Sequence, residues 1–294
     1  MGMRIRTNVT SLLTQRNVAN NTKDLGDSIE KLASGYRINQ SKDDSAGLAI
    51  SENMRAKIRG LNQAKRNAND AVSMIQVAEG GMSETSNILV RMRELAVQAS
   101  TDTIGDTERS FLNKEYVQLG QEIDRIAATT EFNGNKFFVQ DPDNPKTQYT
   151  IQVGNNWKDG EVNTNTISMN LEGLKFTAAD MGIGNGNEIG PSTIGDTAPS
   201  REEIAQKLGV LDNALSRIAT ERATIGSIQS RLGSTVNNLM TSVENLGSAR
   251  SRIVDVDFAE ETSNLAQRKI LSQSSIAVLA QANQTPEMVL SLLR

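Results

Sequence analysis

Apolar residues return at a seven-residue interval through the first third of the chain. From position 54 to position 96 every seventh residue is apolar: Met54, Leu61, Ala68, Ile75, Met82, Leu89 and Ala96. With an apolar frequency of 37%, chance would produce this run in one chosen register about once in a thousand trials. A seven-residue period of this length predicts a long helix that packs lengthwise against other helices in a coiled coil.

Steps of three and four continue the pattern in two further segments. The first segment predicts a second helix: Leu112, Tyr116, Leu119, Ile123 and Ile126. After Pro199 a longer series predicts a third helix: Ile204, Leu208, Leu211, Leu215, Ile218, Ile225, Leu232, Val236, Leu239, Val243, Leu246 and Ile253. Ser200 and Glu203 make a capping box at its start. Because each buried side chain contributes about 2 kcal/mol, we expect these helices to cover one another in an antiparallel rod.

The stretch from position 132 to position 199 differs in composition, since it holds four of the five prolines. Apolar and polar residues alternate at 149–153 and again at 165–171, which is typical of β-strands. We therefore expect a small β-hairpin region followed by a glycine-rich tail.

Both ends of the chain carry another helical pattern. Near the start it includes Val18, Thr22, Leu25, Ile29, Leu32 and Tyr36, and near the end Phe258, Leu265 and Leu279. Apolar pairs such as Leu12 and Leu13 make this surface wider than one seam. We expect the surplus to be buried between copies of the protein. A patch that fits a different patch on the next copy builds an open helical filament.

These elements predict a mainly α fold: long antiparallel helices packed as a coiled-coil rod, with paired terminal helices and a small β-hairpin region. We predict three parts. Residues 1–44 with 255–294 form a terminal helical filament-core domain, residues 45–131 with 200–254 form a helical rod domain, and residues 132–199 form a short variable insert.

The amino-acid composition excludes most kinds of catalytic and metal-binding site. The chain has no cysteine and no histidine, so it lacks His general bases, Cys nucleophiles, Cys/His zinc sites and disulfides. A net charge of -4 gives no attraction to nucleic acid or to an anionic membrane. No apolar run approaches the roughly 18 residues of a membrane span, and the first residues do not suggest a cleavable signal. We expect no cofactor, no metal, no membrane insertion and no catalysis.

Several short sequence blocks stand in a fixed order in the two halves of the chain. The first half contains SGYRIN at 34–39, KDDSAGLAI at 42–50 and RMRELAVQ at 91–98. The second half contains DFA at 257–259 and LAQANQ at 279–284. In this combination the chain resembles bacterial flagellin, the filament subunit of the flagellum, over roughly residues 4–138 and 205–294.

The resemblance implies a structural subunit that self-polymerises into the extracellular flagellar filament for motility. It implies paired terminal helices around a channel, which become ordered on assembly. Its implied partners are further copies of the chain, the hook–filament junction and cap proteins, and a flagellar secretion chaperone at the C-terminal helix. Export would use the flagellar type III apparatus without signal-peptide cleavage.

Two sets of site residues follow. We expect packing in the filament core to use Ile5, Leu12, Leu25, Ile29, Leu32, Phe258, Leu265, Ile276, Leu279, Leu290 and Leu293. Flagellins that activate Toll-like receptor 5 use an Arg and a Leu of the RMRELAVQ block and a Glu on the next helix. The matching positions are Arg91, Leu95 and Glu115. We expect packing between subunits in the rod to be their primary role, with receptor binding incidental to it.

Three other functions are consistent with parts of the pattern. A flagellin-related hook–filament junction protein shares the helical termini, but the LAQANQ block at 279–284 argues against it. A coiled-coil adaptor that never polymerises would not need matched apolar helices at both ends. A hydrolase would have to work without His or Cys.

Overall fold

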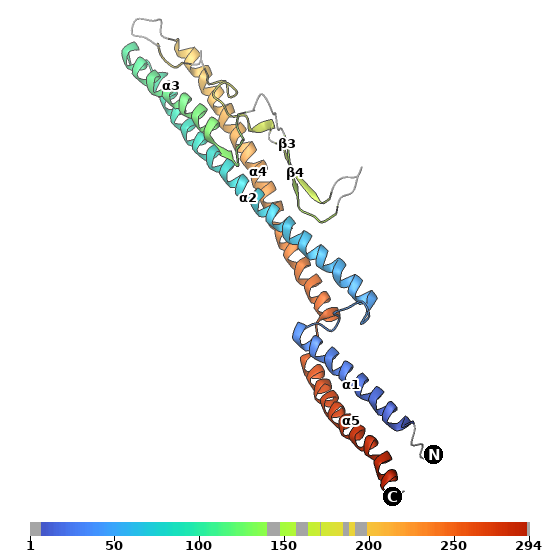
Figure 1. The fold of residues 1–294 in the computed structure, drawn as a ribbon. Helices are drawn as coiled ribbons and strands as arrows, with labels where there is room; N and C mark the ends of the chain where they lie inside the picture. Colours follow the sequence, from blue (N-terminus) through green and yellow to red (C-terminus); the bar gives the residue numbers. More distant parts are fainter. Residues whose placement is uncertain are drawn as a thin grey trace. The chain divides into compact units, whose positions relative to one another are not determined.

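The computed structural model describes residues 7–139, 148–156, 164–170, 172–184, 188–191 and 199–292, with only the backbone at 172 and at 285–292. Within these ranges it has five α-helices: α1 (Val9–Ser34), α2 (Ser45–Ala99), α3 (Asp106–Thr129), α4 (Arg201–Val254) and α5 (Phe258–Leu292). The strands are β1 (Glu131–Phe132), β2 (Asn135–Lys136), β3 (Gln148–Gln152) and β4 (Thr166–Asn170), followed by a short 3₁₀ helix, η1 (Glu172–Leu174). The predicted mainly α fold is confirmed (Figure 1).

The chain divides into two units. The terminal unit comprises Met1–Ile58 and Glu244–Arg294, and the rod unit comprises Arg59–Val243. Two predicted domain boundaries coincide with helix ends, because α2 begins at Ser45 and α4 ends at Val254. The division into three domains stays a prediction.

The rod unit is built around the predicted seven-residue seam of α2. Ala68, Ile75, Met82, Leu89 and Ala96 all have 0% of their surface exposed. The same core takes side chains from α3 and α4 at predicted positions: Tyr116, Ile123, Ile126, Ile204, Leu211, Ile218, Ile225 and Leu232. The seven-residue period therefore identified the faces along which these helices pack.

The predicted hairpin is confirmed in β3 and β4, which pair antiparallel with Ile151 opposite Ile167. One face of β4 is buried through Ile167 and Met169, whereas Ser168 is exposed. This alternation is what a strand with one face on a core requires. The shorter hairpin of β1 and β2 turns at Asn133 and Gly134, whose φ angles of 51° and 75° suit the Asn-Gly pair.

The connection after η1 is held to the helices by side chains that bond its backbone. The Asp124 carboxylate of α3 accepts from the Ala178 amide at 2.7 Å, and Asn113 Oδ1 accepts from the Ile189 amide at 3.0 Å. Arg217 of α4 donates to the carbonyl oxygens of Gly173, Lys175 and Asp180. These bonds satisfy backbone groups that no sheet or helix partner reaches.

Side chains also set where the long helices begin. The predicted capping box is confirmed, since Ser200 N donates to Glu203 Oε2 at 2.8 Å and Glu203 N donates to Ser200 Oγ at 3.3 Å. Asp257 caps α5 by accepting from the Ala259 and Glu260 amides. Asp257 therefore has a structural role at a helix N-terminus.

Candidate assembly surface

The terminal unit pairs α1 with α5 in antiparallel orientation (Figure 1). Near the start of α1, Ser11 Oγ donates to Asn283 Oδ1 at 2.7 Å. Further along, Asn21 Nδ2 donates to Ser275 Oγ at 2.6 Å. Polar side chains therefore form hydrogen bonds across the seam between the two helices.

Many of the large apolar side chains of this pair are exposed. Among the side chains described between positions 9 and 34 and between 258 and 284, the buried ones are polar: Ser11, Ser28 and Glu261. The large apolar side chains with exposed surface are Val9, Leu12, Leu13, Ile29, Phe258, Ile270, Leu271, Ile276 and Val278, at 46–63%. In a single chain, the terminal pair thus presents an unburied apolar surface, which marks an interaction site.

The residues predicted for filament-core packing divide between the seam and this outer surface. Leu25, Leu32, Leu265 and Leu279 are half-buried in the pair. The exposed members are Leu12, Ile29, Phe258 and Ile276, at 52–58%. Ile5 and Leu293 lie outside the described residues, as does the side chain of Leu290.

The seam differs in one respect from the predicted spacing. Thr22 and Ile29 were expected on the same stripe as Leu25, but both are exposed, and Asn21 and Ser28 take the seam positions. Apolar character alone would place Ile29 in the seam, whereas hydrogen bonds to α5 place its polar neighbour Ser28 there.

A joint connects the ends of this pair to the flanking helices of the same unit. Tyr36 and Asp255 form an antiparallel bridge, and Val256 N donates to Gly35 O at 3.0 Å. Arg37 Nη2 donates to the Ile253 carbonyl at 2.7 Å, which satisfies a group left free at the end of α4. Both connections to the pair are therefore fixed by hydrogen bonds.

The three residues matched to receptor recognition do not share one exposed surface. Arg91 and Glu115 lie together, because the Arg91 guanidinium and the Glu115 carboxylate are 2.9 Å apart. The hydrogen bonds that Arg91 donates to the Glu115 and Glu94 carboxylates raise the pKa of Arg91 above its usual value. Leu95, in contrast, is 1% exposed and belongs to the rod core.

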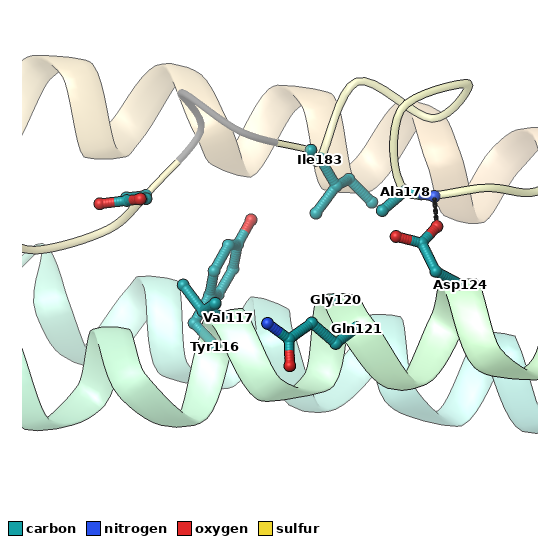
Figure 2. A pocket seen from close by; sticks show the side chains of 9 residues that line it. Tyr116, Val117, Gly120, Gln121, Asp124, Ala178 and Ile183 are labelled. Atoms are coloured by element: carbon teal, nitrogen blue, oxygen red, sulfur yellow. Dashed lines mark hydrogen bonds between the residues drawn. The ribbon is translucent and has the colours of Figure 1, made fainter. Parts of the chain in front are cut away.

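A small pocket with a volume of about 90 Å³ lies between α3 and the residues Ala178, Ile183, Gly184 and Glu188. Figure 2 shows Tyr116 reaching into it and the Asp124 carboxylate turned toward the Ala178 amide. Burial raises the pKa of the Tyr116 hydroxyl to about 12, so the hydroxyl stays neutral. The space is large enough for about three water molecules, and its carboxylates, Asp124 and Glu188, make hydrogen bonds within the protein.

In the described part of the chain, no group of three or more acidic side chains could hold a metal ion. No described helix combines the length and apolar character needed to cross a membrane.

Comparison with known proteins identifies the family. The model of the bacterial flagellin N-terminal helical region matches residues 5–141, and that of the C-terminal helical region matches residues 208–293. Flagellin from Bacillus subtilis is 41% identical over 99% of this chain and 100% of its own length. The chain belongs to the bacterial flagellin family.

Other relatives agree with this membership. Flagellin from Halalkalibacterium halodurans is also 41% identical, over 99% of this chain and 100% of that protein. A solved structure described as a flagellar hook-associated protein of Vibrio parahaemolyticus has a TM-score of 0.57 at 14% identity, over 73% of this chain and 100% of that one. At that identity the likeness shows the fold alone.

Family membership gives this flagellin its function. It is a structural subunit that polymerises into the flagellar filament and serves motility, and it is not an enzyme. The adaptor and hydrolase interpretations are therefore set aside, and the exposed apolar surface of the terminal pair needs an explanation within a polymer.

Sequence reasoning missed the polar residues that position the elements. Asn113, Asp124 and Arg217 fix the connection after η1, and Asn21 and Arg268 join α1 to α5. A usable signal existed for the second group, because polar residues recur seven positions apart where an apolar seam was expected.

Proposed function

We propose that this flagellin polymerises through the outward apolar faces of α1 and α5, which pack against the same helices of neighbouring copies. One observation carries the proposal: the described apolar side chains of the terminal pair stay partly or largely exposed in a single chain, while those of the rod seam are buried. Neighbouring copies are the occupant because the family forms a homopolymer.

The magnitude fits an assembly surface. Nine large apolar side chains, each about half exposed, would contribute roughly 1 kcal/mol apiece when covered, on the order of 9 kcal/mol per subunit. Association costs about 4–15 kcal/mol in lost freedom, so the contribution of this surface is of the same size as that cost. Loss of a few terminal side chains would then shift assembly strongly.

Charge placed on the outward face tests the proposal. Ile270 and Ile276 are 63% and 55% exposed, so Ile270→Asp with Ile276→Asp leaves the rod core untouched. We expect the critical concentration for polymerisation, measured by seeded assembly and sedimentation, to rise at least about 100-fold. Ile270→Val with Ile276→Val is the matched control and should assemble. Filaments at the wild-type critical concentration from the Asp variant would refute the proposal.

The same surface supports the finer partner predictions. A filament of head-to-tail copies leaves one unpaired terminal surface at each end, and we assign these to the hook–filament junction and cap proteins.

Before export, a secretion chaperone would cover the apolar faces of α5. The absence of cysteine suits unfolded passage through a type III apparatus, because no disulfide can form. Intact N-termini in protein sheared from cells would support this route.

Receptor recognition by Toll-like receptor 5 would use the exposed Arg91–Glu115 pair, with Leu95 acting from the core. Arg91 and Glu115 have side chains 51% and 45% exposed, and a partner could reach both. A reporter assay with Arg91→Ala and Glu115→Ala monomer tests this, and undiminished signalling would exclude the pair.

A further inference from the structure

The seam between α1 and α5 contains one largely apolar column and one largely polar column on each helix. In α1 the first column is Ser11, Val18, Leu25 and Leu32, and the second is Thr14, Asn21 and Ser28. In α5 the first is Leu265, Ser272 and Leu279, and the second is Glu261, Arg268, Ser275 and Ala282. Each of these side chains is buried or half-buried.

Hydrogen bonds join the two polar columns at matched positions. Asn21 Nδ2 donates to Ser275 Oγ at 2.6 Å, and Arg268 Nη1 donates to Ser28 Oγ at 2.8 Å. These two contacts are one seven-residue repeat apart on both helices. Arg268 Nη1 also donates to the Asp24 carbonyl at 2.5 Å. A single guanidinium therefore binds both a side chain and the backbone of α1.

Hydrophobic burial alone would choose a different arrangement. Leu12 and Leu13 on α1 and Ile270 on α5 are 48–63% exposed, and hydrophobic burial favours a rotation of each helix that turns such side chains inward. That rotation would separate Arg268 from Ser28 and from the Asp24 carbonyl. Polar seam residues in coiled coils specify one arrangement at a cost in stability.

We propose that Arg268 is a positioning residue that selects which faces of α1 and α5 meet, with the Asn21–Ser275 bond as its second fixed point. By holding the polar columns together, it keeps the apolar faces outward. The inference concerns pairing within one chain, and it rests on the proposed function only for the use that neighbouring copies make of those faces.

Introduced cysteines can report the facing directly, because the chain has none of its own. Ser11→Cys with Asn283→Cys replaces a pair in contact at 2.7 Å and reports the native facing. Leu12→Cys with Asn283→Cys uses a position 58% exposed and reports a rotated one. Intrachain disulfide yield is measured by non-reducing electrophoresis and peptide mass spectrometry, on full-length protein as dilute monomer and as filament.

With Arg268 in place, we expect the native reporter to form its disulfide about tenfold more efficiently than the rotated reporter. Arg268→Leu should bring this ratio close to one, because leucine cannot form the hydrogen bonds to Ser28 and to the Asp24 carbonyl that favour one face. Lys269→Leu removes one positive charge from the adjacent exposed position and should leave the ratio unchanged. Arg268→Lys, which keeps a charged donor, should restore most of the preference.

Two results would overturn the proposal. One is an unchanged ratio in the Arg268→Leu protein. The other is loss of both disulfides, since Arg268 would then hold the helices together without selecting their faces. Filament formation is measured separately from the disulfide ratios. If the Ile270→Asp, Ile276→Asp protein still assembled while the disulfide ratios stayed as expected, the proposal about the outward faces would fail and the one about Arg268 would stand.

Discussion

In the rod unit, the seam positions of α2 are occupied by side chains such as Ile75, Met82 and Leu89, which have no exposed surface. In the terminal pair, the seam combines half-buried leucines such as Leu25 with the polar residues Ser28 and Arg268, and other leucines and the isoleucines are exposed. The same seven-residue period therefore serves two purposes. The rod unit completes its core within one chain, whereas the terminal pair leaves nine large apolar side chains exposed, and we propose that neighbouring copies cover them.

Matched leucine truncations should separate the two regions most clearly. Leu89→Ala removes a side chain with 0% exposure from the rod core and should cost about 2–5 kcal/mol of unfolding free energy. Leu271→Ala makes the same chemical change at a site 46% exposed and should cost about 0.5 kcal/mol or less in the monomer. Thermal unfolding of monomer followed by circular dichroism measures both, and equal losses would contradict the distinction.

Alkaline pH should weaken the rod unit through Tyr116. Burial raises the pKa of its hydroxyl to about 12, above the ordinary value of about 10 in the unfolded chain. The stability that the neutral hydroxyl contributes is complete below pH 10 and is lost as pH rises toward 12. By pH 11.5 the loss of unfolding free energy amounts to about 2 kcal/mol. Tyr116→Phe should lose correspondingly less stability between pH 9 and pH 11.5.

Denaturant unfolding of the wild type and of Tyr116→Phe, at pH 9 and at pH 11.5, measures this difference. If Tyr116→Phe lost as much stability as the wild type over this range, the buried hydroxyl would not be its source.

The smallest effect is expected at the start of α4. Ser200→Ala breaks the bond to the Glu203 amide and should cost about 1 kcal/mol. Glu202→Gln, a change at an exposed neighbour, should cost less. Hydrogen exchange of the first turn of α4 should accelerate only in the Ser200→Ala protein, and equal exchange in both proteins would argue against the cap.

Much of the rod could be predicted from the sequence because its apolar repeats and its cap are local signals. Met82 and Leu89 fall on the predicted seam, and Ser200 with Glu203 forms the predicted capping box. The alternation at 149–153 likewise found β3. In each case one physical preference, burial or capping, decides the outcome by itself.

The terminal pair was harder to predict because two preferences compete there. Ile29 fits an apolar stripe, but the structure gives the seam to Ser28, which Arg268 binds from 240 positions away in the chain. The seven-residue recurrence of polar residues marks these seam positions, but the identity of a hydrogen-bond partner so far away in the chain leaves no local trace in a sequence. The same holds for Asp124 and Arg217, whose partners are backbone groups of the connection after η1.

Hydrogen exchange measured by mass spectrometry, on dilute monomer and on filaments, tests the central claim most directly. In the monomer, the account predicts strong protection in the rod-unit parts of α2, α3 and α4 and weak protection in α1 and α5, because the terminal pair buries few apolar side chains. In filaments, α1 and α5 should become as protected as the rod. Equal and strong protection of α1 and α5 in monomer that does not polymerise would contradict it.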